Sequence, residues 1–174
     1  MISLVYVFWM YVILFAVIGA LRGWVKELMV VFSVILTLTT NHVLRRFVPM
    51  IRDMPVDSTS LFWIRTISLV VLVYFGYQTV ISIQRLAARA ARERLQDTLF
   101  GIFMGAINGY LIAGTLLFYL NDAKYFPSFI TNPEGTNLEQ IKAMLNWLPP
   151  HVLGEPGIYF AIVLCFIFVI VVFI

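Results

Sequence analysis

The sequence predicts an all-α membrane protein, a polytopic bundle of five transmembrane helices. Of its 174 residues, 61% are hydrophobic and only 12% are charged, a composition atypical of soluble domains. Five long runs carry no charge or a single one, and each approaches or exceeds the length that crosses a bilayer. These runs are residues 2–21, 28–44, 61–83, 98–120 and 158–174.

The first three runs are predicted as spans in turn. Residues 2–21 have no basic segment before them, and Ile18 stands where signal-peptide cleavage needs a small residue, so we expect a retained span. Residues 28–44 form the second span. Residues 61–83 form the third, in which Arg65 lies close enough to the start for its side chain to reach the headgroups.

The fourth run carries small residues at every fourth position. They are Gly101, Gly105, Gly109 and Ala113. In lipid, helices associate through close backbone approach over small residues, so this spacing predicts a packing face that neighbouring helices grip. Asn108 shares the ridge, where we expect an interhelical hydrogen bond. Asp97, directly before the run, is a good N-cap residue for the fourth helix.

The connections between the runs are too short for a separate domain. Apolar residues recur in the last connection at the spacing of an amphipathic helix, and the Pro149-Pro150 pair is expected to end that helix. The chain therefore divides into three parts. They are residues 1–120 with the first four predicted spans, an extramembrane connection with a short interfacial helix at 121–157, and a C-terminal span at 158–174.

Lysine and arginine are divided equally between the two sides of a five-span topology. The density of arginines in 84–97 favours a cytoplasmic location for the first and third connections. Arg85, Arg89 and Arg92 form one stripe of a helix, where contact with lipid headgroups is expected and a protein-docking face is the alternative. The net charge is only +3, so no nucleic-acid partner is expected.

Few residues have the character of a chemical site. No ionisable side chain is expected deep inside a span, which argues against a pump, and no nucleophile–base pair is evident. His42 and His151 are isolated, and ligation of a pigment or haem iron by either is an open alternative to an interfacial role. We therefore predict no catalytic, cofactor or metal site and no small-molecule substrate. The expected partners are membrane lipids and other membrane proteins, or a second copy.

Two motifs carry a resemblance. Arg22-Gly23-Trp24-Val25-Lys26-Glu27 resembles the Arg-Gly-x-x-x-Glu turn of the colicin V production protein (CvpA) family. The run from Asp97 to Gly109 is similar to that family's aspartate-led, glycine-spaced fourth span, although Asn108 replaces a frequent arginine and Thr98 a basic residue. The resemblance covers roughly residues 1–120.

The resemblance implies a small multi-pass protein of the bacterial inner membrane, linked to toxin export and envelope integrity and without enzymatic chemistry. It also implies a four-helix core with Arg22, Gly23, Glu27 and Asp97 as family motif residues. A non-enzymatic accessory or scaffold protein that acts through helix–helix contacts is the resulting expectation. The alternative is a small peripheral subunit of a large respiratory or photosynthetic complex, and a channel or carrier is a third class.

Overall fold

The computed structural model describes residues 3–78, 94–125, 130 and 132–173. Within these ranges the chain forms eight helices and no strand. They are α1 (Leu4–Arg22), α2 (Trp24–Phe47), α3 (Pro49–Arg52), α4 (Thr59–Gln78), α6 (Arg94–Asp122), α7 (Thr136–Leu145), α8 (Pro149–Val152) and α9 (Gly157–Phe173).

The predicted all-α membrane bundle is confirmed. Four of the described helices, α1, α2, α4 and α6, are long and apolar enough to cross a membrane. A fifth crossing arises if the stretch Thr136–Val152 and the helix Gly157–Phe168, which meet at a 50° bend, are taken together as one span. α9 covers the fifth span predicted at 158–174 as far as Phe173, but by itself it is not among the four helices that are long and apolar enough to cross.

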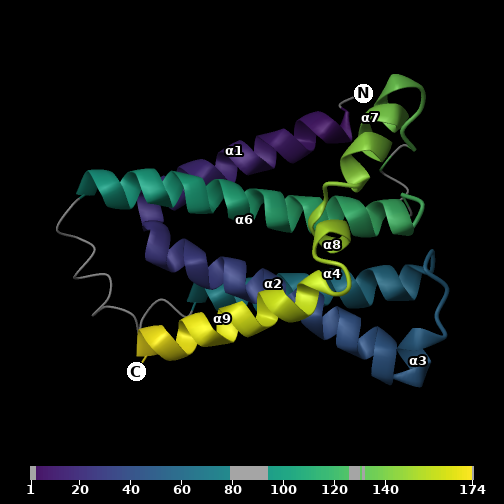
Figure 1. Ribbon diagram of the computed structural model, residues 1–174. Helices are drawn as coiled ribbons and strands as arrows, with labels where there is room; N and C mark the ends of the chain where they lie inside the picture. Colours follow the sequence, from purple (N-terminus) through teal and green to yellow (C-terminus); the bar gives the residue numbers. More distant parts are fainter. Residues whose placement is uncertain (1–2, 79–93, 126–129, 131, 174) are drawn as a thin grey trace.

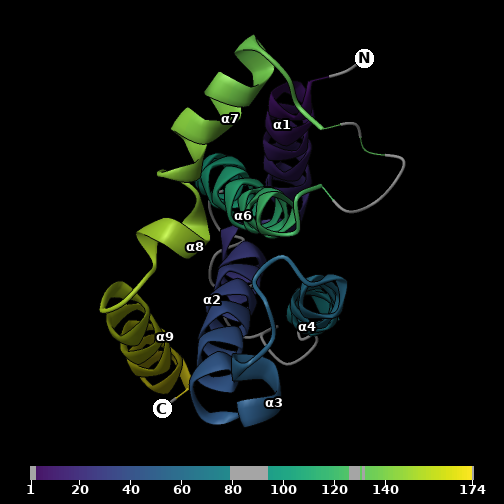
Figure 2. The same ribbon diagram turned by 90° about the vertical axis from the view of Figure 1, so that its right-hand side faces the viewer.

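The helices alternate in direction between two ends of the bundle (Figure 1). One end, the Gly23 end, holds the corner between α1 and α2 together with the start of α6. The other, the α7 end, holds the N-terminus, α3 and α7. In the view turned by 90°, α6 lies between α1 and α2, while α4 and α9 flank α2 on either side (Figure 2).

The connection between α1 and α2 is a single residue, shorter than the predicted loop over 22–27. Gly23 has φ 84°, a conformation that glycine adopts without the steric cost a Cβ imposes. α2 therefore begins at Trp24, and Glu27 belongs to its first turn instead of to the loop. From the sequence, the charge of Glu27 assigns this residue to the loop between the first two spans. In the structure, the residues around Glu27 supply partners for that charge.

Two apolar clusters hold the bundle together. The first joins α2, α4, α6 and α9, and the second joins α1 and α6 to the segment after α7. Burial of such side chains away from lipid gains packing contacts, since the lipid tails are already apolar. The first comprises Val34, Leu38, Leu69, Leu111, Tyr119 and Ile158, and the second Phe8, Ala113, Leu117 and Leu148.

The long connection contains the predicted amphipathic helix, but its end is different. α7 ends at Leu145, and Pro149 begins the separate helix α8, because proline fits the first turn of a helix where no N–H is needed. Ile141 is buried and α7 contacts α1, so its apolar face packs on this chain. Trp147 remains 75% exposed.

Candidate functional site

The small-residue ridge of α6 lies directly against α1. A Cβ added to Gly19 of α1 would overlap the carbonyl oxygen of Gly101 and stand 2.8 Å from the Cα of Gly105. A Cβ added to Gly109 would stand 2.7 Å from the Cα of Val12. The two backbones therefore touch along a glycine seam that is filled within the chain. Ala113 continues the ridge into the second apolar cluster.

Asp97 serves α2 and not its own helix, so the predicted N-cap of the fourth span is wrong. α6 already includes Arg94, which puts Asp97 inside its first turn. Its Oδ1 accepts a hydrogen bond from the backbone N of Trp24 at 3.3 Å, one of the N–H groups that the start of α2 leaves without a partner. A Cβ on Gly23 would lie 2.6 Å from Oδ2 of the same carboxylate, so only glycine leaves room for it.

Glu27 and Asn108 are both fully buried and bind each other across the α2–α6 contact. Nδ2 of Asn108 donates to Oε2 of Glu27 at 2.8 Å and to the backbone oxygen of Glu27 at 2.9 Å. A buried carboxylate is costly unless it is paired and hydrogen-bonded. The interhelical hydrogen bond of Asn108 thus goes to α2, beside the glycine seam with α1.

Arg22 connects this pair to α4. Its Nη1 lies 3.3 Å from Oε1 of Glu27, and its Nη2 donates to the backbone oxygen of Tyr77 at 3.3 Å. The guanidinium also stacks over the Tyr77 ring, 4.2 Å from its centroid, in a cation–π contact. The residues Arg22, Glu27, Tyr77, Asp97 and Asn108 are called the motif cluster below. Sequence reasoning missed Tyr77, because one aromatic residue among many in a span gives no signal.

Two ionisable side chains of the long helices are buried in the protein. Glu27 is one. Arg65 is the other: its Nη1 lies 2.9 Å from Oδ2 of Asp122 at the end of α6. The guanidinium also lies 5.3 Å from the ring centroid of Tyr119. An acidic partner on a neighbouring helix makes burial of the arginine tolerable.

The two histidines and the arginine stripe are the remaining residues that the sequence singled out. Nε2 of His42 lies 2.8 Å from Oε1 of Glu155 and 3.0 Å from Oη of Tyr159. His151 is exposed in α8. Within the described ranges, no group of three or more His, Cys, Asp or Glu side chains could hold a metal ion. Arg85, Arg89 and Arg92 lie outside the described residues.

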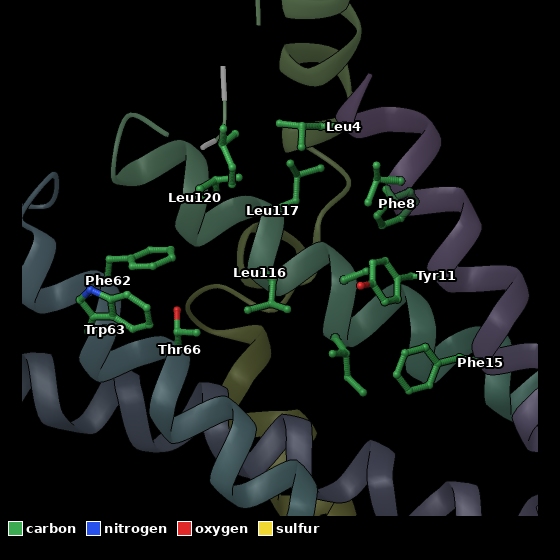
Figure 3. A pocket seen from close by; sticks show the side chains of 14 residues that line it. Leu4, Phe8, Tyr11, Phe15, Phe62, Trp63, Thr66, Leu116, Leu117 and Leu120 are labelled. Carbon is green, nitrogen blue, oxygen red and sulfur yellow. The ribbon is translucent and has the colours of Figure 1, made fainter. Parts of the chain in front are cut away.

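An apolar cleft of about 410 Å³ lies between α1 and α4, with α6 as its floor (Figure 3). Aromatic side chains line both walls, among them Phe8 and Phe15 from α1 and Trp63 from α4. Thr66 of α4 turns its hydroxyl into the cleft, and this buried Oγ1 has no hydrogen-bond partner among the described residues. The cleft is thus largely apolar, and its lining carries the hydroxyls of Thr66 and Tyr11 and the indole N–H of Trp63.

The fold and the motif cluster define a multi-pass α-helical membrane protein whose helices are linked at one end by buried polar groups. The chain belongs to the colicin V production protein family, whose family model matches residues 5–132. The match contains every residue of the motif cluster and confirms the resemblance carried by the two sequence motifs. No curated protein matches the chain, and no solved structure does.

Proposed function

We propose that this chain is a non-enzymatic accessory protein of the cell inner membrane, which supports toxin secretion or envelope homeostasis by binding another membrane protein. One observation carries the proposal. The buried polar groups at the Gly23 end, including Glu27 and Asn108, bind one another and tie α1, α2, α4 and α6 together. Such groups are expensive in a membrane and normally mark function, and here they serve to hold a rigid scaffold. The family match favours this role over that of a respiratory or photosynthetic subunit.

The apolar cleft is the face we assign to the partner. The glycine seam is occupied by α1, so a second protein needs another surface. The cleft offers aromatic walls and the unpartnered hydroxyl of Thr66, which fits an apolar transmembrane helix carrying one polar side chain. An interhelical hydrogen bond of this kind contributes on the order of 1 kcal/mol, which adds specificity to apolar packing.

The test uses a bacterial strain that lacks this gene and produces an exported peptide toxin. Toxin in the medium and leakage of a periplasmic marker are measured after complementation with the wild type, with Trp63→Ala or with Trp147→Ala. Trp63 lines the cleft, whereas Trp147 is exposed outside it and is the matched control. We expect the wild type and Trp147→Ala to restore export and marker retention, and Trp63→Ala to restore neither despite equal membrane levels.

Three results would contradict the proposal in whole or in part. Export and marker retention that do not change when the gene is deleted would remove the accessory role. Full complementation by Trp63→Ala would be compatible with the accessory role but would show that the cleft does not bind the partner. Solute flux through liposomes that hold only the purified chain, abolished by Asn108→Leu, would assign it to the carriers.

A further inference from the structure

A second pocket, of about 220 Å³, lies at the α7 end of the bundle. It forms where α2, α4 and α6 meet the corner between α8 and α9. Its polar lining comes from five side chains on three helices, and Pro150 and Gly154 close it from the corner. The five are Asn41, His42, Arg45, Arg65 and Tyr119.

The charges around this pocket do not balance. Arg65 is paired with Asp122, whereas Arg45 is half-buried and has no hydrogen bond or ion pair among the described residues. Arg45 interacts electrostatically with both of these groups, by repulsion with Arg65 and attraction with Asp122. Two guanidinium groups thus share one carboxylate. The next acid, Glu155, is bound to His42 and Arg46.

Neutral donors complete the site. The hydroxyl of Tyr119 accepts a hydrogen bond from Nδ2 of Asn41 at 3.1 Å, which leaves its own proton free to be donated. Both side chains are buried, Tyr119 at 4% exposure and Asn41 at 7%. A half-buried guanidinium beside a second one is unfavourable by itself, and an anion that accepts hydrogen bonds from both relieves the repulsion.

We propose that this pocket binds a phosphate group, with Arg45 as its main cationic ligand and Arg65, Asn41 and Tyr119 as supporting donors. The planar fork of arginine matches the oxygens of a phosphate, which favours this anion over a halide. The pocket lies near the ends of α2 and α6, at Phe47 and Asp122, where a bilayer presents its headgroups. The phosphate therefore comes from a phospholipid headgroup or from free phosphate in solution.

Binding is measured by native mass spectrometry of the full chain purified in a mild detergent without phosphate. The probes are phosphatidylglycerol, a diacylglycerol with the same acyl chains but no phosphate, and inorganic phosphate. The variants are Arg45→Gln and the matched control Arg46→Gln, since Arg46 is exposed and bound to Glu155 outside the pocket. We expect Arg45→Gln to weaken binding of the phosphate-bearing probe about tenfold, from the loss of a hydrogen bond to a charged group. Arg46→Gln should bind as the wild type does.

The outcomes separate the two sources. Tight binding of phosphatidylglycerol with weak binding of inorganic phosphate identifies a lipid headgroup, and the reverse identifies soluble phosphate. Equal affinity for diacylglycerol and phosphatidylglycerol together with no binding of inorganic phosphate overturns the proposal, and so does failure of both phosphate probes to bind. Wild-type affinity in Arg45→Gln does so as well. The comparison of the two lipids needs no variant, so it holds even if Arg45→Gln fails to fold.

Discussion

The carboxylate of Asp97 accepts a hydrogen bond from the backbone N–H of Trp24, with 3.3 Å between Oδ1 and N. The two residues belong to different helices, and the contact completes the N-terminus of α2, whose own N-cap, Gly23, has no side chain to do so. The motif aspartate Asp97 and the motif glycine Gly23 therefore act together at the start of α2. The glycine turns the chain, and the aspartate supplies the cap that glycine lacks.

Replacing Asp97 tests this shared cap. Asp97→Ala should lower the free energy of unfolding by about 1 kcal/mol, the usual effect of losing a capping side chain. Asp97→Asn keeps an acceptor oxygen. It should lower the free energy of unfolding by only about 0.3 kcal/mol, because the negative charge at the positive end of α2 is missing. Thermal unfolding of the purified variants in detergent measures both. Equal midpoints for Asp97→Ala and the wild type would mean that the cap contributes nothing.

The glycine seam predicts that a large side chain at a seam position of α6 disrupts folding. Gly105→Leu should reduce the yield of folded monomer severely, because a side chain at this position meets the carbonyl oxygen of Phe15 and the Cα of Gly19 in the same chain. Phe103→Leu is the matched control on α6, since Phe103 is 62% exposed. Yield and elution volume in gel filtration report the result. A Gly105→Leu monomer as stable as the wild type would show that α1 does not need this close approach.

The sequence was sufficient for the class of fold and for the ridge on α6. Hydropathy and length predict the helix ends to within a few residues wherever the structure describes them, because a bilayer sets both. The partner of the ridge was not predicted, since the glycines of α6 say that a helix approaches and not which one. Gly19 of α1, the residue they meet, stands four residues before Gly23, a Gly-x-x-x-Gly spacing that sequence reasoning missed.

The positions of the charged residues were harder to predict from the sequence than the helices, for a physical reason. From the sequence, a charge at the edge of an apolar run was assigned to the loop or to the headgroups, without knowledge of a partner on another helix. Glu27 has Asn108 on α6, and Arg65 has Asp122. These pairs join residues far apart in the chain, so only the packing of the helices brings them together.

The contact between Glu27 and Asn108 predicts a measurable coupling. Asn108→Leu alone should destabilise the protein by roughly 1–3 kcal/mol, because it removes the amide donor from a buried carboxylate and leaves Arg22 as its remaining partner. Adding Glu27→Gln to Asn108→Leu should cost less than Glu27→Gln costs alone, with a coupling energy of about 0.5–3 kcal/mol. Unfolding of the two single variants and the double variant completes the cycle. Strictly additive effects would show that the two side chains act independently.

Breaking the ion pair between Arg65 and Asp122 should lower the free energy of unfolding more than breaking a surface ion pair does. Both side chains are largely buried, at 8% and 19% exposure, so Asp122→Ala leaves a buried guanidinium without its carboxylate. Breaking such a pair typically costs roughly 3–5 kcal/mol. The exposed pair of Lys124 and Asp57 is the control, because Lys124→Ala should change the free energy of unfolding by about 1 kcal/mol or less. Similar losses from both variants would contradict the burial argument.

The contact between α2 and α9 should depend on pH through Glu155. A hydrogen bond from the hydroxyl of Tyr159 is the main cause that lowers the pKa of this carboxyl from its ordinary 4.5, and Arg46 and His42 lower it further against a smaller desolvation effect. A lowered pKa in the folded state gives stability that is present above about pH 4.5 and is lost as the pH falls through the lower folded value. The thermal midpoint of the wild type should therefore fall below about pH 4.5 more steeply than that of Glu155→Gln. Glu139→Gln, which alters an exposed residue of α7, should follow the wild type, and parallel curves for all three would remove Glu155 from this role.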